Sequence, residues 1–553
     1  MILARRLARA ALPLTALALL GVAPSLPPMS AEETVAANTV RAHVEFLADD
    51  RLEGRDMGSR GHEIAAAYVA SRFRALGLEP GGPNGSWFQQ VPLRRASTAD
   101  SLPAMTLVGG GRSRPLRFGV DVAIAPSVTE RHRAIDAPLV FVGYGLDEPL
   151  LGLNDYRGLD VRGKIVVALG GTPDGLSSEI TAHLASTKDD SAARHGAIGF
   201  VEIARDPRNP GRIGGVAGMA RRSAVDWVDS SGRSGNVPQG LRARLAFSPQ
   251  WQERLFDGAA RSLAAVRAQA KGVARPRGFP LATRLSITAD SKWEDFTSPE
   301  VIGRLPGADP ARSAENVVLM AHLDHLGVKR DAKPGEDAIY NGALDNAAGV
   351  ATMLEAAREF VASGTRPARS VLFIANTGEE KGLLGADYFA SHPTVPIGSI
   401  ASVVDLDMPL PLYNFTDVIA FGADHSTVAQ SVAEAGRSMG IGVSADPMPQ
   451  ESIFVRSDHY RFVSRGVPAI LLMTGFANGG EAVWKRFLAH TYHSPSDDLG
   501  QPIEWRALAR YGMLNYRIAR ALADAPMRPR WYAGDYFGDR FAPSQARALR
   551  RSP

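Results

Sequence analysis

The feature that most constrains this fold is a regular alternation of short apolar runs and helical patterns that begins near Glu315. The clearest helix is predicted over residues 350–361, where apolar side chains recur at helical spacing and Gly364 follows as a stop signal. The runs typical of buried strands are Val317–Ala321, Val371–Ala375, Ser402–Asp405, Val418–Phe421 and Ala469–Met473. This alternation predicts an α/β fold, with a mainly parallel mixed sheet flanked by helices and with functional sites at the carboxyl ends of its strands.

The first 31 residues have the pattern of a secretory signal peptide. Three arginines precede the apolar stretch Ala10–Ala23, which is shorter than a membrane span and is followed by Pro24 and Pro27. We therefore expect residues 1–31 to be removed and the protein to be exported, to the periplasm or the extracellular space, with no stable membrane insertion afterwards. A retained membrane anchor is the alternative interpretation.

The composition narrows the chemistry. The chain has no cysteine, which excludes disulfides and restricts strong metal ligands to His, Asp and Glu side chains. Its 62 Lys and Arg residues give a formal net charge of only +4 and form no dense basic block, so we expect no nucleic-acid partner. At 553 residues, the chain is expected to fold into more than one domain. Nothing in the sequence indicates the oligomeric state.

The chain before residue 286 divides into two predicted parts. Residues 32–130 are expected to form an N-terminal segment, helical over Val35–Leu78, that packs on the main domain. Residues 131–285 carry short β runs separated by turns, and the sequences FVGYGL (141–146) and NDYRGLDVRGKIVV (154–167) resemble the protease-associated domain of several metallopeptidases. We therefore expect a β-rich inserted domain, followed by a main domain over 286–525 and a C-terminal tail over 526–553.

Five segments place imidazole or carboxylate side chains in loops or at strand ends of the main domain. They are AHLDHLG (321–327), YNGALDNAAG (340–349), ANTGEEKGLLG (375–385), VVDLDM (403–408) and YHSPSDD (492–498). Each alone has a plain interpretation: Asp345 or Asn346 could cap a helix, and two adjacent Glu residues are usually solvated. Asp405 and Asp407 are harder to explain, because carboxylates that interrupt an apolar strand are unfavourable unless they are paired or bind metal.

Together and in this order, the five segments resemble the M28 family of zinc peptidases over residues 315–525, with some similarity also over 47–81. The resemblance implies a zinc-exopeptidase fold and two zinc ions. His322 and Asp407 would hold one ion, Glu380 and His493 the other, and Asp345 would bridge them. Asp405 is the rival of Asp407, but Met408 directly follows Asp407 as in the family pattern.

The same resemblance assigns catalytic roles. Glu379 falls at the general base, Asp324 at the aspartate that accepts the second ring proton of His322, and Tyr492 at a tyrosine that contacts the reacting carbonyl oxygen. The expected substrates are peptides, hydrolysed at the N-terminal residue by a metal-activated water. The additional imidazoles in the same segments and nearby are interpreted as structural or pocket residues: His325, His459 and His490.

Two other functions fit the same scaffold. A carboxypeptidase or dipeptidase would need arginines that grip a C-terminal carboxylate, and the sequence does not show whether Arg456, Arg461 or Arg486 point inward. A receptor-like homologue without catalysis would be expected to lack metal ligands, whereas all five positions are filled here. An aminopeptidase is therefore the leading hypothesis.

Overall fold

The computed structural model describes residues 29–206, 215–271 and 275–550. Residues 1–28 of the expected signal peptide lie outside this range; Ser30 and Ala31 lie inside it, where Ser30 caps the first helix. No helix in the described ranges has the length and apolar character needed to cross a membrane.

The first domain is built on a mixed sheet whose central strands are parallel, which confirms the predicted α/β class. Register pairs give the spatial order β2–β13–β17–β14–β18–β21–β19–β20. In this order β17, β14, β18 and β21 are mutually parallel, β13 is antiparallel to both of its neighbours, and β19 is antiparallel to β21 but parallel to β20. The strands are β2 (Phe88–Thr98), β13 (Phe279–Leu305), β14 (Asn316–His322), β17 (Ser370–Asn376), β18 (Ile400–Asp405), β19 (Asp417–Phe421), β20 (Gly442–Ser444) and β21 (Ala469–Thr474). Every residue of β14, β17, β18 and β21 is buried, as continuous apolar runs in a covered parallel sheet require.

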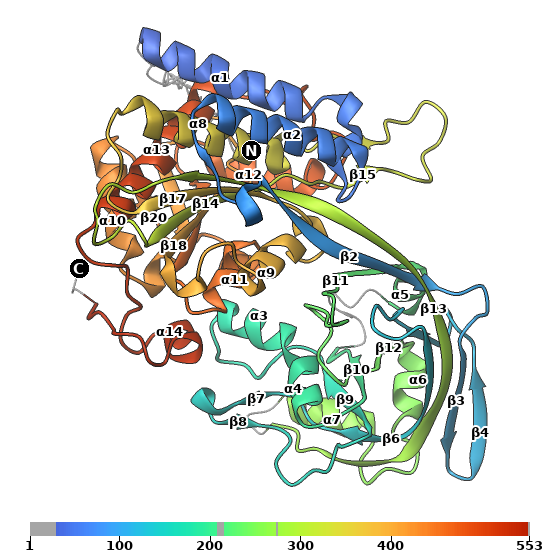
Figure 1. Ribbon diagram of the computed structural model, residues 1–553. Helices are drawn as coiled ribbons and strands as arrows, with labels where there is room; N and C mark the ends of the chain where they lie inside the picture. The colour runs from blue at the N-terminus through green and yellow to red at the C-terminus, as the bar shows by residue number, and fades with distance from the viewer. Residues whose placement is uncertain (1–28, 207–214, 272–274, 551–553) are drawn as a thin grey trace, which may run out of the picture.

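Helices cover both faces of this sheet (Figure 1). On one face α8 (Ala348–Ala362) and α13 (Trp505–Asp524) pack against each other and on β14. Helix α1 (Ala31–Leu47) lies outside them, and α2 (Arg60–Ala75) packs on β13. On the other face lie α9 (Leu384–Ser391) and α11 (His459–Val463). The remaining helices of this domain are α10 (Val428–Ser438) and α12 (Gly480–His490). The predicted helix at 350–361 corresponds to α8.

The N-terminal segment is helical, but it forms two helices where the sequence pattern predicted one continuous stretch. A turn of 3-10 helix, Asp50–Arg55, separates α1 from α2 and directs the chain toward the first sheet. Arg55 in this turn is 1% exposed. Its Nε donates to the carbonyl oxygen of Leu323 over 2.9 Å, and its Nη1 donates to that of Asn341 over 2.6 Å. These hydrogen bonds join the N-terminal segment to the loops of the first domain that contain Leu323 and Asn341.

A second domain has its own sheet and its own hydrophobic core. The order is β4–β3–β13–β6–β9–β10–β12–β5, with β6, β9, β10 and β12 parallel. Its strands and helices are β3 (Ala104–Gly109), β4 (Arg112–Leu116), β5 (Val122–Ile124), β6 (His132–Phe141), β9 (Ile165–Leu169), β10 (Gly199–Ile203), β12 (Ala243–Phe247), α3 (Ser178–Ser186), α4 (Lys188–Arg194), α5 (Val216–Arg221), α6 (Pro249–Arg254) and α7 (Leu263–Ala270).

The boundaries of this second domain differ from the expected 131–285. Strands β3, β4 and β5 precede residue 131 and pair within the second sheet, so they are not part of the N-terminal segment. At the other end β13 runs without a break for 27 residues from the second sheet into the first, paired along 291–301 with β2 (Figure 1). No strand was predicted from the sequence at β3, β4, β5 or β13. The likeness to a protease-associated domain stays a prediction.

The C-terminal tail packs on the body of the protein and joins the two domains. Trp531 and Phe537 are each 1% exposed, and α14 (Tyr536–Phe541) lies next to α3 of the second domain. His425 of the first domain lies between two acids at this junction. Its Nδ1 is 2.6 Å from Asp535 of the tail, and its Nε2 is 3.2 Å from Glu179 of α3.

We expect this imidazole to make the contact between the domains pH-dependent. Burial disfavours the charged ring, but Asp535 and Glu179 outweigh that effect and raise the pKa of His425 from 6.5 to about 9. A raised pKa stabilises the fold fully below pH 6.5, and the contribution is lost as the pH rises through 9; the full effect is on the order of 3 kcal/mol. His425→Gln should therefore lower the melting temperature at pH 6 and flatten its dependence between pH 6.5 and 9.

The matched control is His132→Gln, because His132 pairs with Asp290 on the surface, where its side chain is 64% exposed and the ion pair contributes little. A melting curve of His425→Gln with the same pH profile as the wild type would contradict the assignment.

Candidate metal centre

The predicted ligands lie where parallel strands end. His322 is the last residue of β14, Asp407 follows β18 by two residues, and Glu379 and Glu380 follow β17 by three and four. These strands are neighbours and parallel, so their carboxyl ends meet at one edge of the sheet. Asp345 reaches the same edge from the turn before α8, and His493 reaches it from the loop after α12.

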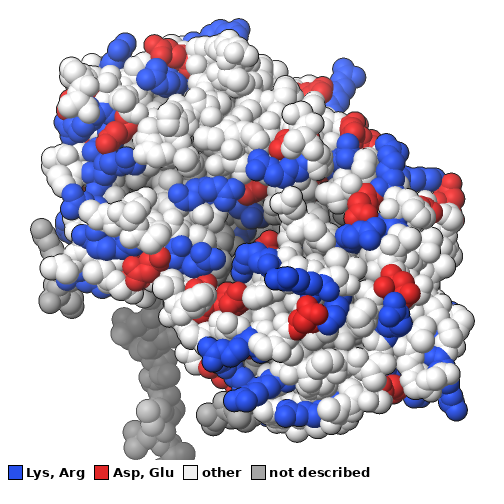
Figure 2. Space-filling model, turned by 60° about the horizontal axis from the view of Figure 1, so that its bottom comes forward, with Lys and Arg blue, Asp and Glu red and all other residues white. Residues whose placement is uncertain are grey.

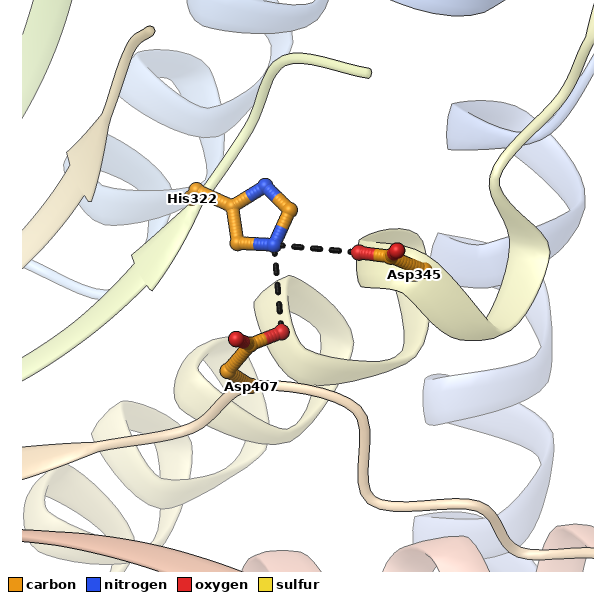
Figure 3. Close-up of side chains that lie close together, drawn as sticks. All are labelled: His322, Asp345 and Asp407. Atoms are coloured by element: carbon orange, nitrogen blue, oxygen red, sulfur yellow. Dashed lines mark hydrogen bonds and ion pairs between the residues drawn. The ribbon is translucent and has the colours of Figure 1, made fainter. Parts of the chain in front are cut away.

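One group of donors forms around the His322 ring (Figure 3). The Nε2 atom of His322 is 3.1 Å from Oδ1 of Asp407 and 3.2 Å from Oδ1 of Asp345. All three residues are buried, and their ligand atoms lie within 4.8 Å of one another. An imidazole nitrogen and two carboxylate oxygens that converge in this way form a set that could hold a metal ion.

A second group shares Asp345 with the first. The Nε2 atom of His493 is 3.1 Å from Oε2 of Glu380 and 3.4 Å from Oδ2 of Asp345. His325, which the sequence interpretation left outside the site, also lies here: its Nδ1 is 2.6 Å from Oε1 of Glu380, and the two residues form with Asp345 a group that could hold an ion. The only sequence signal for His325 was its position three residues after His322.

The two groups are electrostatically coupled. Burial disfavours the charged ring of His322, but Asp407 and Asp345 outweigh it and raise its pKa well above the usual value. In the second group burial likewise disfavours the charged ring of His493, but the acids Asp345 and Glu380 outweigh it and raise the pKa of His493 to about 10. The imidazoles in turn lower the pKa of Glu380 to about 2 against the effect of its burial. The Glu380 carboxylate therefore stays charged, as a metal ligand must.

Asp405 and Asp407 lie in different surroundings. Asp407 contacts His322 through Oδ1 and accepts a hydrogen bond from the Ser457 hydroxyl through Oδ2, over 2.9 Å. Asp405 accepts from the same hydroxyl over 2.8 Å and from the backbone N–H of His459 over 3.2 Å. The Nδ1 atom of His459 also lies 3.2 Å from Asp405. Of the two rival carboxylates, only Asp407 belongs to a group of potential metal ligands in the described part of the chain.

Asp324 does not occupy the position expected for its side chain. The Nδ1 atom of His322 lies 3.1 Å from the backbone carbonyl oxygen of Asp324, so this carbonyl is in place to accept the second ring proton, not the carboxylate. The carboxylate instead accepts a hydrogen bond from the backbone N–H of Glu379 over 3.2 Å. The difference arises because the chain turns after β14, which points the Asp324 side chain toward the loop of Glu379. Asp324 thus connects the His322 strand to the Glu379 loop.

Glu379 and Tyr492 line one pocket together with Asp345 and Asp407. Burial raises the pKa of Glu379 well above its ordinary value, and the charges of Glu380 and Asp407 add to this effect against the opposing charge of His322. Burial likewise raises the pKa of Tyr492, so its hydroxyl keeps its proton and remains a donor. The ring of Tyr492 stacks on that of His493, with centroids 3.8 Å apart.

The other wall of this pocket is apolar. It is formed mainly by Met408, Ile453, Leu471, Met473, Trp484 and Leu488. The cavity volume is about 70 Å³. Arg456, one of the three arginines left open by the sequence, also lines the pocket, and its Nη1 is 3.3 Å from Oε2 of Glu451.

Two positioning residues were not found by sequence reasoning. Asp497 accepts hydrogen bonds from the backbone N–H groups of Leu344 (2.9 Å) and Asp345 (3.0 Å), which fixes the turn that presents Asp345. Burial raises the pKa of Asp497 to about 6. Arg55 donates hydrogen bonds to the carbonyl oxygens of Leu323 and Asn341, and its Nη2 also donates to the carbonyl oxygen of Gly342 over 3.1 Å. It therefore links the loop after His322 to the turn before Asp345. Their only sequence signals were an Asp-Asp pair and a Gly-rich turn.

Comparison with known proteins places the chain among peptidases. The sequence model described as Peptidase family M28 matches residues 300–519, which contain every residue of both donor groups. Leupeptin-inactivating enzyme 1 of Streptomyces exfoliatus is 29% identical over 185 residues, which cover 32% of this chain and 36% of that protein. The alkaline phosphatase isozyme conversion protein of Escherichia coli K12 is 34% identical over 98 residues, or 17% of this chain and 27% of that protein. The chain thus spans about a third or less of the length of these curated relatives.

Similar solved structures extend over more of the chain. An aminopeptidase from Aneurinibacillus sp. strain AM-1 covers 89% of this chain and 95% of its own, with a TM-score of 0.49 and 20% identity. A zinc aminopeptidase from Bacillus subtilis covers 87% and 93%, with a TM-score of 0.41 and 18% identity.

Proposed function

The chain belongs to peptidase family M28, and we propose that it is an exported di-zinc aminopeptidase that removes N-terminal residues from peptides. The observation that carries this proposal is the pair of donor groups joined by Asp345, whose two carboxylate oxygens face His322 on one side and His493 on the other. One bridging carboxylate between two His/acid groups is the arrangement that two-metal hydrolases need. The proposed export rests on the pattern of residues 1–31.

The residues present fit two zinc ions. The donors are imidazole nitrogens and carboxylate oxygens, and among the described residues Nε2 of His325 is a buried polar atom at this centre without a hydrogen-bond partner. His322 and Asp407 would hold one ion, Glu380 and His493 the other, and Asp345 both. His325 is placed to join the second set. When bound, the ions supply Lewis-acid activation of water and of the peptide carbonyl.

Glu379 is the proposed general base. It lines the pocket beside Asp345 and Asp407 but belongs to neither donor group, so its carboxylate is free to move a proton. It would take a proton from the attacking water and deliver it to the nitrogen of the departing peptide. Asp324 holds the backbone N–H of Glu379 and so fixes the loop that carries this side chain.

Tyr492 and the apolar wall orient the substrate. The protonated Tyr492 hydroxyl would donate a hydrogen bond to the carbonyl oxygen as negative charge develops on it. The side chain of the first substrate residue would lie against Met408, Met473 and Trp484. Because burying an apolar side chain there is favourable, we expect a preference for substrates that begin with leucine or methionine.

The charges at the pocket favour an amino terminus over a carboxyl terminus. Among the described lining residues Arg456 is the single cationic side chain, and it pairs with Glu451. A C-terminal carboxylate would therefore find no free cation here, whereas an ammonium group meets carboxylates. This distribution in the pocket supports an aminopeptidase over the alternative carboxypeptidase; the other alternative, a dipeptidase, would need a cation for the C-terminal carboxylate outside this pocket. The complete donor groups likewise disfavour a non-catalytic, receptor-like role.

We expect purified protein to cleave leucine p-nitroanilide and to leave N-acetyl-leucine p-nitroanilide intact. The free ammonium group is lost in the acetylated compound, so its hydrolysis should be at least about 100-fold slower, as expected when a buried charged group loses its partner. Removal of metal with a chelator should abolish activity, and added zinc should restore it.

Two outcomes would overturn this proposal. Cleavage of the acetylated compound at a similar rate would exclude an aminopeptidase. Activity that persists when elemental analysis finds no metal in the protein would exclude the zinc mechanism.

A further inference from the structure

A cavity of about 410 Å³ lies between the two domains, next to the loop that carries the metal-centre glutamates. Its walls come from β6, β12 and the residues 125–128 that follow β5 in the second domain, and from Lys381, Gly382 and Arg461 of the first domain. A further wall is β11 (Ala224–Trp227), which pairs with β2 at the edge of the first sheet. Lys381 directly follows Glu380 in the sequence. This cavity is therefore separate from the apolar pocket but adjoins the same loop.

The cavity, called here the basic cavity, is lined by five cations and one acid. The cations are Arg133, Arg242, Arg244, Lys381 and Arg461, and the acid is Asp226. On the molecular face in Figure 2, Lys and Arg side chains gather around a central hollow. Asp226 forms no ion pair with these cations in the described ranges; its carboxylate accepts hydrogen bonds from the backbone N–H groups of Trp227 and Asn236, and from the Ser234 hydroxyl.

Three of these cations have acidic partners outside the cavity. Arg242 pairs with Glu130 over 2.8 Å, Arg244 pairs with Asp189, and Lys381 lies 3.4 Å from Asp56. Arg133 and Arg461 form no ion pair with any acid in the described ranges. The basic cavity therefore holds two cations without an ion-pair partner, beside the single carboxylate of Asp226.

Arg133 is the most unusual of these residues, because it is only 2% exposed. One hydrogen bond is found for its guanidinium, from Nη1 to the carbonyl oxygen of Arg242 over 3.1 Å. Within the described chain, the buried Nε atoms of Arg133, Arg244 and Arg461 have no acceptor. Burial lowers the pKa of Arg133 only to about 10, so it stays charged at neutral pH. A buried guanidinium without an acid partner is costly, and an anionic ligand would offset this cost.

Arg461 connects the basic cavity to the catalytic loop. Its Nη2 donates to the carbonyl oxygen of Gly382 over 2.9 Å and to Oδ1 of Asn236, in the second domain, over 3.1 Å. Gly382 ends the short turn that contains Glu379 and Glu380. A ligand held by Arg461 and Arg133 would thus contact both domains within a few residues of the proposed base.

We propose that the basic cavity binds a carboxylate of the peptide substrate on the leaving-group side of the scissile bond, and so favours short peptides with a free C-terminus. This inference rests on the proposed aminopeptidase function. Guanidinium groups bind carboxylates through two parallel hydrogen bonds, which suits the unused donors of Arg133 and Arg461. The volume fits a few residues of peptide, and the cavity is walled by two domains, which excludes a long polyanion such as nucleic acid.

The test compares free-acid and amidated forms of one peptide series on the zinc-loaded protein: leucyl-glycine, leucyl-glycyl-glycine and leucyl-glycyl-glycyl-glycine. We expect kcat/KM to be about 10-fold higher for the free acid than for the amide at one or two lengths. Because each residue extends the chain by at most about 3.6 Å, the preferred length measures the distance from the metal centre to the basic cavity. An amidated peptide with aspartate at its last position distinguishes a side-chain carboxylate from the main-chain one.

The variant Arg133→Gln should reduce the ratio of kcat/KM for free acid over amide to about one, and Arg133→Lys should retain part of it. Arg461→Gln tests the opposite wall and should lower the same ratio. The matched control is Arg131→Gln: Arg131 is exposed, lies over the Trp293 ring at 4.5 Å and does not line the cavity, so the ratio should stay at the wild-type value. Melting curves show which variants fold.

A second measurement separates this proposal from the aminopeptidase proposal. Binding of N-acetyl-leucyl-glycyl-glycine and its amide is measured by calorimetry, without turnover. If the protein cleaves no peptide but binds the acid more tightly than the amide in an Arg133-dependent way, the basic cavity is supported and the proposed function fails. A wild-type ratio near one at every length, a preference unchanged in both arginine variants, or Arg133-dependent binding of inorganic phosphate alone would overturn the carboxylate site.

Discussion

Glu379→Gln is expected to lose turnover while keeping both zinc ions. The amide cannot take a proton from water or return it to the leaving nitrogen, so kcat for leucine p-nitroanilide should fall by about 10²- to 10⁴-fold. Glu379 belongs to neither donor group, so the metal content should not change. The measurements are kcat and zinc per chain by elemental analysis on the same preparation.

The control for this substitution is Glu434→Gln, the same chemical change on an exposed position of α10. It should leave kcat and zinc content at wild-type values. Loss of zinc from Glu379→Gln would show that Glu379 is a ligand and that the division of labour between Glu379 and Glu380 is reversed.

Asp345→Asn is expected to lose metal as well as activity. Asp345 is the residue shared by both donor groups, and an amide offers a neutral oxygen to each ion in place of a charged one. Changes to residues one step further from a metal already weaken binding about 10- to 100-fold, so loss of a bridging ligand should exceed that. Zinc titration of the apoprotein measures the affinity, and the zinc-dependent rise in melting temperature should shrink with it.

The aspartates after β18 provide an internal comparison for this experiment. Asp407→Asn should weaken zinc binding, because Asp407 contacts His322, whereas Asp405→Asn should keep the zinc and lose stability, because Asp405 holds Ser457 and the backbone of His459. Zinc loss from Asp405→Asn alone would make Asp405 the ligand.

Local patterns were sufficient for five strands of the first sheet and for α8. Buried strands such as β14 and β17 are short apolar runs, and α8 has apolar residues at helical spacing. Burial of such an element therefore gives a pattern among residues that are close in the sequence. Pairing is different, because it joins segments far apart in the chain. For this reason the partners of β3 to β5, and the passage of β13 through both sheets, were not predicted.

The metal centre, too, was predictable from the sequence only in part. The sequence by itself determined which residue types gather, because parallel strands place whatever follows them at one edge: His322, Glu380 and Asp407 come from three such ends. Only the tertiary structure decided which atoms meet. His325 faces Glu380, the Asp324 carboxylate turns to Glu379, and Arg55 reaches Leu323 across 268 residues. Side-chain direction in loops depends on contacts from distant segments, and these contacts leave no periodic pattern in the sequence.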